Sequence, residues 1–463
     1  MPSVDVFIPL LFILFFSIYR FGVPYRTITY LVGLRVLAVG LFVYFVLRSW
    51  VWMMVPLLLV VIILILLGWP HLKLDLEQPA SRTRKILWGI AFSLSVLSLI
   101  LTALFPIRAI PQPTGALTVG TFSWDIHTQR EEYYADDPEA LRSFRVQAWY
   151  PASETTERAL WLGDGPFTSQ GLARDFGFPG FIFNHLRHTR SHAHDRVPVL
   201  EGSYPLVIIS HGWSGFRQLH TDLAEELASH GFIVIGIEHT YGSVGTVFED
   251  GTQRSLNPQA LPRRAVTPNF LEFANALVGT YASDIISLLD EIEIDTESGL
   301  KADIVNSLDL SFVTVIGHST GGGAAVKVSL TDERVHGVIG LDAWVEPLDA
   351  SELTQGLRVP SLLIRSEGWL ISHNNPYLKT LIENSSTPPT AFQMNGTTHY
   401  DFGMVYMFTS LAPWIGLQGQ RGLQMPIDQN AIVLDYLNHR LQTSHMVFDW
   451  ERYTEVEPLI FPE

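Results

Sequence analysis

The stretch from Phe312 to Lys327, FVTVIGHSTGGGAAVK, constrains the fold of this chain more than any other. Mostly β-branched or aromatic residues run directly into GHSTG (residues 317–321), and small, helix-compatible residues follow. The order strand, sharp turn, helix is the context in which a G-x-S-x-G turn presents a serine hydroxyl at the end of a sheet. Strained backbone angles expose that hydroxyl, and the flanking glycines leave room for the neighbouring strand and helix. The alternative is that Ser319 merely opens a glycine-rich helix.

Short apolar stretches alternate with helical patterns through the C-terminal part of the chain. The strand candidates are 117–126, 144–150, 205–210, 232–239, 312–317, 337–342, 360–365 and 390–396, and the helix candidates are 218–230, 270–294, 321–329 and 427–441. This alternation predicts an α/β protein with a mostly parallel sheet covered on both faces, the layout of an α/β-hydrolase. The first two strands are joined without a helix, so we expect them to form an antiparallel edge. The stretch 161–196 is too rich in Gly, Pro and polar residues to assign.

The N-terminal part of the chain is strongly apolar. Residues 27–47 (interrupted by Arg35), 51–69 and 86–107 are each about twenty residues long, enough for helices that cross a hydrocarbon core of about 30 Å. We therefore expect an all-α transmembrane bundle of three helices, and 6–19 is either a fourth span or an interfacial helix. The start, MPSVDV, lacks the basic region of a signal peptide.

Charge separates two parts of the chain. The balance of Lys and Arg over Asp and Glu is +6 up to Gln112 and −22 for the remainder. The proline-rich stretch from Pro106 to Gly115 is typical of a stiff linker. We therefore expect a transmembrane region with linker at 1–112 and an α/β-hydrolase domain at 113–463. An acidic domain argues against nucleic-acid binding, and the lack of cysteine excludes disulfides and thiolate nucleophiles.

Basic residues flanking the apolar segments predict the orientation. If the spans alternate, one side carries Arg20, Arg26, Lys73, Arg82, Arg84 and Lys85, and the other carries Arg48 and Arg108. The more basic side faces the cytoplasm by the positive-inside rule, which predicts a multi-pass membrane protein with an extracytoplasmic hydrolase domain. Arg35 is expected to snorkel or pair within the bundle.

Catalysis by Ser319 requires a base and an acid that orients it. In α/β-hydrolases these follow in the order Ser, acid, His. His399, in NGTTHYDF after the last strand candidate, is the expected base, with His373 as the alternative. Asp342 and Glu367 each end a strand candidate, and spacing alone leaves the choice of acid between them open.

The oxyanion hole requires backbone N–H groups directed at the developing negative charge. One is expected from Thr320, the residue after the nucleophile. The second is expected from Trp213, in the SHGW stretch that follows a strand candidate. His211 precedes the glycine of that stretch, so we expect a structural hydrogen-bonding role for it rather than catalysis.

Other polar residues are weaker candidates. His185, His188, His192 and His194 lie in HLRHTRSHAHD, whose spacing matches no zinc pattern, and we interpret the stretch as a polar loop near the mouth of the active site. Asp284, on the long helix candidate, is expected to make structural hydrogen bonds. We expect no metal and no cofactor.

Five motifs together resemble a known family. They are SHGWSGFR at Ser210, ASHGFIVIGIEH at Ala228, GHSTGGG at Gly317, GLDAW at Gly340 and GTTHYDF at Gly396. They occur in the same order in the serine-dependent platelet-activating factor acetylhydrolases, and the similarity covers most of 144–441. The resemblance implies hydrolysis of short or oxidised acyl esters of phospholipids without a metal.

The resemblance also implies roles for individual residues. Ser319 would be the nucleophile, His399 the base and Asp342 the acid, in place of Glu367, with Trp213 and Thr320 as oxyanion donors. Two features depart from the family: Trp213 is bulkier than the usual aliphatic residue, and a membrane bundle replaces the secretory signal.

Three function classes follow from the sequence. The first is a membrane-anchored serine esterase or lipase that acts on a lipid or small ester. The second is a general carboxylesterase for small or polymeric esters, since this fold supports many acyl-transfer specificities. The third is a catalytically idle membrane sensor, which would not require Ser, His and acid together. The sequence does not indicate an oligomeric state.

Overall fold

The computed structural model describes residues 4–20, 26–48, 51–68, 82–294, 298–369, 372–442 and 448–461. Its internal contacts define two compact units. The N-terminal unit comprises 1–108 with the short segments 181–188 and 407–411, and the sheet unit comprises 109–180, 189–406 and 412–463. The expected division of the chain into 1–112 and 113–463 stays a prediction.

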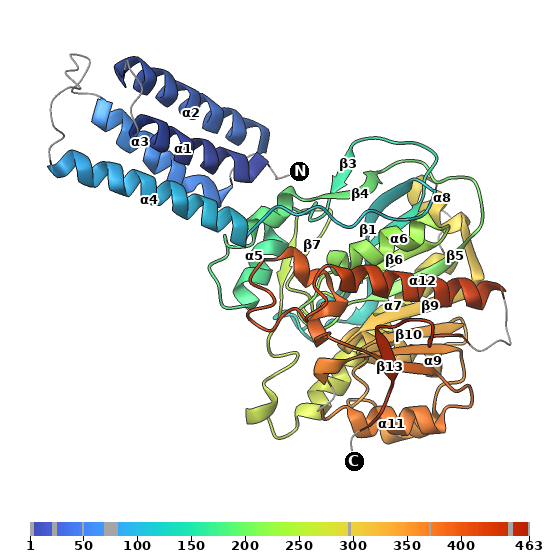
Figure 1. Cartoon of the computed structure of the whole chain (residues 1–463). Coiled ribbons are helices and arrows are strands. Elements are labelled where there is room, and N and C mark those ends of the chain that lie inside the picture. The colour runs from blue at the N-terminus through green and yellow to red at the C-terminus, as the bar shows by residue number, and fades with distance from the viewer. Residues whose placement is uncertain are drawn as a thin grey trace. The chain divides into compact units, whose positions relative to one another are not determined.

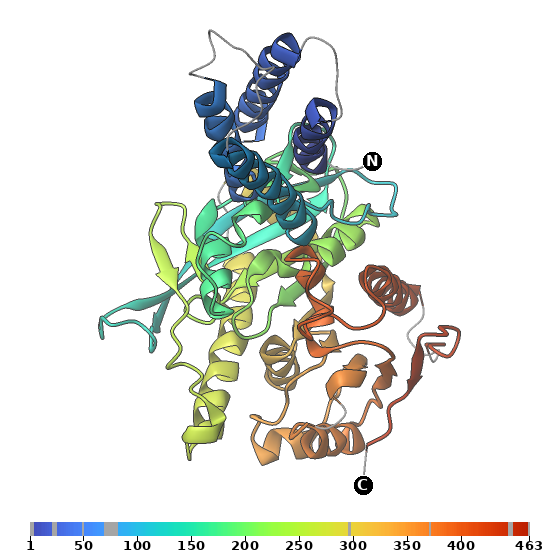
Figure 2. The same ribbon diagram turned by 60° about the vertical axis from the view of Figure 1, so that its left-hand side comes forward.

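The described part of the N-terminal unit is helical (Figures 1 and 2). Its elements are α1 (Val4–Arg20), α2 (Arg26–Arg48), the 3-10 turn η1 (Trp52–Met54), α3 (Val55–Gly68) and α4 (Arg82–Leu104). Helix α1 packs against α2 and α4, and α3 also packs against α2 and α4. Phe12, Phe16 and Leu57 lie in the buried core, and Tyr44 donates a hydrogen bond to the buried Asp5 at 2.6 Å.

The expectation of three or four membrane-spanning helices is not confirmed. Among the described residues, only Lys85–Leu104 forms a helix long and apolar enough to cross a membrane. The apolar parts of the other helices, Asp5–Ile18, Tyr30–Val46 and Trp52–Leu67, are shorter. Of the basic residues counted for orientation, Lys73 lies outside the described residues.

The sheet unit is built on an 11-stranded sheet with the order β13-β12-β11-β10-β9-β5-β6-β2-β1-β4-β3. The strands are β1 (Val119–Glu131), β2 (Leu141–Pro151), β3 (Arg158–Leu160), β4 (Arg190–Asp195), β5 (Tyr204–Ser210), β6 (Ile233–Glu238), β9 (Leu308–His318), β10 (Gly337–Leu341), β11 (Ser361–Ser366), β12 (Thr390–Met394) and β13 (Val456–Pro458). The six strands from β12 to β6 in this order are parallel to one another. A separate two-stranded sheet joins β7 (Gly245–Val247) and β8 (Gln253–Ser255).

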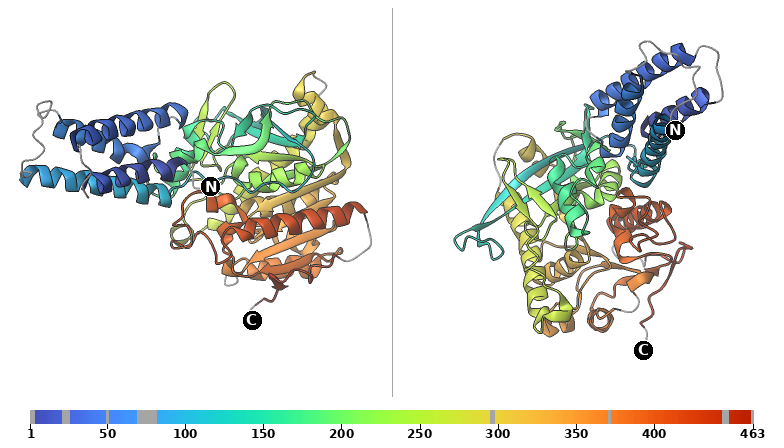
Figure 3. Two further views of the ribbon diagram at one scale, coloured as in Figure 1. Left: turned by 45° about the horizontal axis from the view of Figure 1, so that its top comes forward. Right: turned by 90° about the vertical axis from the view of Figure 1, so that its left-hand side faces the viewer.

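Helices cover both faces of this sheet (Figure 3). They are α6 (Thr221–Ser229), α7 (Phe270–Ile294), α8 (Leu300–Asn306), α9 (Thr320–Thr331), α10 (Ala350–Gln355), α11 (Asn375–Asn384) and α12 (Gln424–Gln442), and a further helix, α5 (Pro166–Asp175), packs against β7. The 3-10 turns of the sheet unit are η4 (Arg217–His220), η5 (Arg264–Val266), η6 (Glu367–Trp369), η7 (His399–Phe402) and η8 (Met404–Met407), whereas η3 (Asn184–His188) belongs to the N-terminal unit. Side chains alternate across β5: Ile208 packs with α7 and α9 on one face, whereas Val207 packs with α6 and α12 on the other. The predicted mostly parallel, doubly covered sheet is confirmed.

One edge of the sheet differs from the expectation. Strands β1 and β2 pair antiparallel as predicted, but β4 and β3 continue the sheet beyond β1. The polar stretch interpreted as a loop supplies β4, RSHAHD. Only Ser191 and Ala193 of this strand are buried, so its apolar alternation is too weak to recognise from the sequence.

Candidate active site

Ser319 occupies a strained turn between β9 and α9. Its φ of 54° and ψ of −117° lie in a region that non-glycine residues rarely adopt. The flanking glycines are sterically required: a Cβ on Gly317 would lie 2.1 Å from the Gly321 carbonyl oxygen, and one on Gly321 would lie 2.2 Å from that of Ser210. The local sequence thus folds as the strand, turn and helix expected.

Three predicted residues meet at the carboxyl ends of the central strands. His399 Nε2 lies 3.0 Å from Ser319 Oγ, and His399 Nδ1 lies 3.0 Å from Asp342 Oδ2. The Asp342 side chain is fully buried, whereas that of His399 is 16% exposed. In this geometry the imidazole can accept the serine proton while the carboxylate holds the opposite ring nitrogen.

Asp342 is oriented by the next strand. The backbone N–H of Ser366, at the end of β11, donates to Asp342 Oδ1 at 2.7 Å, and the Ser366 hydroxyl donates to Oδ2. With one carboxylate oxygen facing His399, the network favours the imidazole tautomer with hydrogen on Nδ1.

The alternative acid and base lie elsewhere. Glu367 is exposed and accepts a hydrogen bond from the backbone N–H of Gly396 at 2.7 Å. His373 is exposed in the turn before α11. The structure therefore brings together Ser319, His399 and Asp342.

The two expected oxyanion donors flank the nucleophile. Thr320 begins α9 directly after Ser319. On the other side, a Cβ added to Gly212 would lie 3.0 Å from Ser319 Cβ, so the loop carrying Trp213 runs against the serine. The N-terminus of α9 adds a partial positive charge at the same place.

An aromatic side chain that the sequence motifs do not include stacks on His399. The Trp369 ring stacks on the His399 imidazole, with centroids 4.0 Å apart and planes at 16°. The Arg365 guanidinium lies 5.3 Å from the Trp369 ring centroid and donates to the Trp369 carbonyl. The sequence feature that could have indicated this contact is an aromatic residue, Trp369, three positions after the end of the strand at Ser366.

A second imidazole supports the loop that carries the base. His318 Nε2 lies 2.9 Å from the His399 carbonyl oxygen. Burial, together with the neighbouring His399, lowers the pKa of His318 well below its usual range, so the ring is neutral. A neutral ring with hydrogen on Nε2 donates to that carbonyl.

Apolar side chains gather beside the serine. Phe270, Ala274 and Trp344 form a buried cluster, and Leu261 and Trp369 pack against it. The backbone N–H of Trp344 donates to the Ser319 carbonyl at 2.9 Å. This cluster is therefore joined to the Ser319 turn through the Trp344 backbone, and Trp369, which packs against it, also stacks on His399.

The histidine-rich stretch does not form one cluster of metal ligands. His185 is buried in the N-terminal unit, with Nδ1 at 3.2 Å from the Ile182 carbonyl oxygen. His194, on β4 of the sheet unit, lies 2.7 Å from the Thr156 carbonyl oxygen. Within the described ranges, no three His, Cys, Asp or Glu side chains are grouped to hold a metal ion.

Comparison with known proteins identifies the family. The family model described as platelet-activating factor acetylhydrolase, isoform II, matches residues 102–455. This chain belongs to that family. The resemblance expected from the five motifs is therefore confirmed.

Individual relatives are distant and only partly covered. The platelet-activating factor acetylhydrolase of Canis lupus familiaris is 28% identical over 261 residues, which are 50% of this chain and 57% of the dog protein. That of Cavia porcellus is 26% identical over 316 residues, 63% of this chain and 68% of the relative. Cutinase est1 of Thermobifida alba is 25% identical over 252 residues, 53% of this chain and 67% of the cutinase.

A solved structure shares the fold. The ferulic acid esterase from Streptomyces cinnamoneus superimposes with a TM-score of 0.58 at 22% identity, covering 72% of this chain and 93% of the esterase. The α/β-hydrolase fold is thus supported by the sheet, its helices and a solved structure of the same fold.

Proposed function

We propose that this chain is a serine carboxylic ester hydrolase that acts through Ser319, His399 and Asp342. The observation that carries the proposal is the continuous hydrogen-bonded path from Ser319 Oγ through both ring nitrogens of His399 to Asp342 Oδ2. The path begins on a strained turn that exposes the serine. Family membership and the esterase names of several relatives support it.

The first half of the reaction forms an acyl-enzyme. Ser319 Oγ attacks the ester carbonyl carbon while its proton passes to His399 Nε2. The carbonyl oxygen becomes an oxyanion, which accepts hydrogen bonds from the backbone N–H groups of Trp213 and Thr320. The bond to the leaving alcohol then breaks, and the imidazolium gives its proton to the alcohol oxygen.

The second half returns the serine. A water molecule attacks the acyl carbon and loses a proton to His399 Nε2, and the new tetrahedral centre breaks its bond to Ser319 Oγ. The imidazolium protonates that oxygen, and the carboxylic acid leaves. Asp342 stabilises the imidazolium in both halves without taking its proton.

The substrate class is a proposal at a finer level. We propose short or oxidised acyl groups of phospholipids, that is, an activity like that of a 1-alkyl-2-acetylglycerophosphocholine esterase. The Canis lupus familiaris and Cavia porcellus relatives are named platelet-activating factor acetylhydrolases, and the apolar cluster around Phe270 and Trp344 is joined to the Ser319 turn through the Trp344 backbone. General carboxylesterase activity is the second candidate, favoured by the similarity to a cutinase.

A membrane anchor is the proposed role of the N-terminal unit. Apolar side chains face outward on α2, where Val36, Phe42 and Val46 are 59%, 69% and 65% exposed, and α4 contains a helix of sufficient length. Outward apolar side chains are stabilised by lipid. We propose a multi-pass anchor of three or four helices with the hydrolase domain, 113–463, outside the cytoplasm.

The test replaces the nucleophile. Ser319→Ala is expected to lower kcat on a soluble short-chain ester by several orders of magnitude, because only binding and the oxyanion hole remain. Ser311→Ala, which removes an exposed hydroxyl from the same strand, serves as the control and should keep wild-type activity. A serine-directed phosphonate should label the wild type and Ser311→Ala at residue 319 and leave Ser319→Ala unlabelled.

A panel of esters separates the alternatives. Faster hydrolysis of acetyl than of palmitoyl phospholipid supports the proposed specificity. Hydrolysis of small esters without any phospholipid turnover favours the general carboxylesterase. Neither activity, together with no phosphonate labelling, favours the idle sensor, and full activity in Ser319→Ala refutes the assignment of the nucleophile.

A further inference from the structure

A second serine, histidine and aspartate lie in hydrogen-bonded order behind the oxyanion loop. Ser210 Oγ, at the end of β5, lies 2.8 Å from His239 Nε2, and His239 Nδ1 lies 2.9 Å from Asp284 Oδ2. These distances are close to those of the Ser319, His399 and Asp342 set. All three of the inner residues are completely buried.

Arginines neutralise the inner carboxylate. Arg142 Nε and Nη2 donate to the two oxygens of Asp284 at 3.0 and 2.6 Å, and Arg130 Nη2 donates at 2.6 Å. Burial alone would raise the pKa of Asp284, but Arg142 and the hydrogen bond from His239 outweigh it and hold the pKa below its usual range. Arg142 also pairs with Glu132 at 2.7 Å. The four charges of this cluster sum to zero, so no charge on His239 is needed to balance Asp284.

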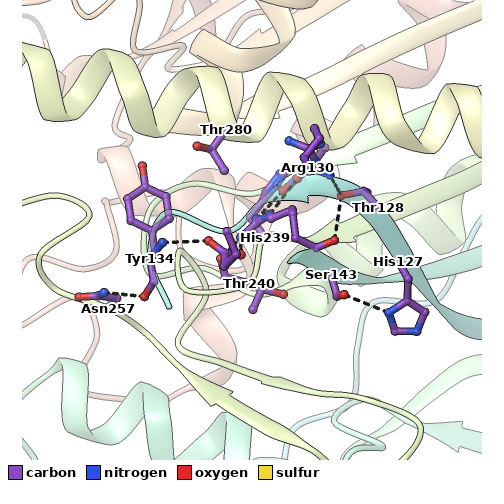
Figure 4. Close-up of polar contacts among 12 residues, drawn as sticks. His127, Thr128, Arg130, Tyr134, Ser143, His239, Thr240, Asn257 and Thr280 are labelled. Carbon is purple, nitrogen blue, oxygen red and sulfur yellow. Dashed lines mark hydrogen bonds and ion pairs between the residues drawn. The ribbon is translucent and has the colours of Figure 1, made fainter. Parts of the chain in front are cut away.

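The charged residues around Asp284 also make hydrogen bonds with the backbone of neighbouring segments, which Figure 4 shows beneath α7. Glu132 accepts the backbone N–H of Tyr134 at 3.0 Å, and Asn257 donates to the Tyr134 carbonyl at 2.9 Å. Arg142 Nη1 donates to the Thr240 carbonyl at 2.8 Å, directly after His239. The backbone directly after His239 is thus held by the same arginine that pairs with Asp284.

The hydrogen bonds continue from His239 into the oxyanion loop. The backbone N–H of His239 donates to His211 Nε2 at 3.2 Å, and His211 Nδ1 lies 2.7 Å from the Gly212 carbonyl oxygen. Burial lowers the pKa of both histidines, so both rings are neutral. Each neutral ring has hydrogen on Nδ1 and a lone pair on Nε2, which satisfies every contact. The Tyr281 ring stacks on His239 with centroids 3.7 Å apart.

We propose that Asp284, His239 and Ser210 form a positioning relay that holds the oxyanion loop, residues 210–213, against Ser319. The relay starts at the charge-balanced carboxylate, passes through His239 to the Ser210 hydroxyl, and branches through His211 to the Gly212 carbonyl. It rests on the proposed acyl-transfer function of Ser319. These three are positioning residues, since none of them reaches the reacting atoms.

Burial and packing decide this role. Ser210 Oγ is enclosed, so no ester carbonyl can approach it, although its contacts match those of a nucleophile. The loop that Ser210 holds is tightly packed, because Gly212 lies against Ser319 and Gly321 lies against the Ser210 carbonyl. Movement of residue 210 would therefore disturb both the Gly212 contact with Ser319 and the Gly321 contact that follows Ser319. A displacement of about 1 Å in such a site costs on the order of a hundredfold in rate.

Single variants test the relay. Ser210→Ala removes one hydroxyl and the hydrogen bond to His239. We expect kcat per phosphonate-titrated site to fall about tenfold to a hundredfold at little-changed KM, because the oxyanion is stabilised only after attack. Affinity for a trifluoromethyl ketone, whose adduct with Ser319 carries an oxyanion, should fall by a similar factor. Ser361→Ala is the matched control. Ser361 is a buried serine, 2% exposed, at the start of β11, whereas Ser366, which contacts Asp342, is at the end of that strand.

A double variant tests whether the residues act together. His239→Gln should lower kcat in the same way, and Ser210→Ala with His239→Gln should cost little more than the larger single effect. Additive losses overturn the relay, as does a kcat for Ser210→Ala equal to that of Ser361→Ala. If the wild type is active but phosphonate does not label Ser319, the proposed nucleophile and the relay both fail. If phosphonate labels Ser319 but Ser210→Ala has the same kcat as the wild type, the relay is overturned and the proposed nucleophile stands.

Discussion

Asp342→Asn should nearly abolish turnover while leaving the site in place. The backbone N–H of Ser366 donates to Asp342 Oδ1 at 2.7 Å, so the amide oxygen of the asparagine will occupy that position. Its NH2 group then replaces Oδ2, which lies 3.0 Å from His399 Nδ1. Two donors cannot face each other, so the imidazole must move its hydrogen to Nε2. That nitrogen can then no longer accept the proton of Ser319.

The expected loss follows from the wrong tautomer. An equivalent exchange in a serine protease lowers kcat by about 10⁴, which corresponds to about 5.5 kcal/mol of transition-state stabilisation. We expect a loss of that order at little-changed KM, measured with a soluble ester and normalised to the sites that phosphonate titrates. Thermal unfolding should show that Asp342→Asn is folded, since the replacement keeps the volume of the side chain.

Glu367→Gln is the matched control for this experiment. Its carboxylate is exposed and accepts a hydrogen bond from Gly396 rather than from the imidazole, so kcat should change less than about threefold. A kcat for Asp342→Asn above about a tenth of the wild-type value would refute the tautomer argument. A larger loss for Glu367→Gln would make Glu367 the acid.

Two further predictions concern the base and the anchor. Trp369→Leu removes the ring stacked on His399. Because such stacking contributes about 0.5–1.5 kcal/mol, kcat should fall about twofold to tenfold. An unchanged kcat in folded protein would contradict a role of Trp369 in positioning the base. A tag inserted after Pro113 should be cleaved by protease added outside intact cells, whereas one near Ala80 should be protected, and the reverse pattern would place the hydrolase domain in the cytoplasm.

Much of the fold follows from local sequence. Strands such as β5 and β10 are continuous apolar runs between turn residues, and α7 was predicted with the bounds Phe270–Ile294 that the structure shows. Strand β4 was missed because its polar residues carry almost no apolar period, and its pairing with β1 is a tertiary effect. The helices of the N-terminal unit were predicted from their apolar length, but among the described residues only Lys85–Leu104 is long and apolar enough by itself to cross a membrane.

The residues of the candidate site could be predicted from the sequence where they belong to a short, recognisable motif. Ser319 and His399 were predicted from a turn pattern and from chain order, and the structure places their side chains 3.0 Å apart, whereas the choice between Asp342 and Glu367 needed the family resemblance. Their strands end side by side, so sequence spacing could not show that Ser366 turns one carboxylate inward while Glu367 is exposed. The stacking of Trp369 on the base depends on a turn after β11 and has no periodic signal.

Two serine, histidine and aspartate sets with nearly equal distances show what hydrogen-bond geometry alone cannot decide. In the outer set, Ser319 stands on a strained turn beside the loop and the helix start that carry the proposed oxyanion donors, and Asp342 faces neutral donors from Ser366 and His399. In the inner set, the Asp284 charge is already paired with arginines and the serine is enclosed. An imidazolium would gain little from a carboxylate neutralised in that way, so the inner imidazole stays neutral. Access to the serine and an available carboxylate charge, rather than distances, therefore make one set suited to acyl transfer and the other suited to holding the loop.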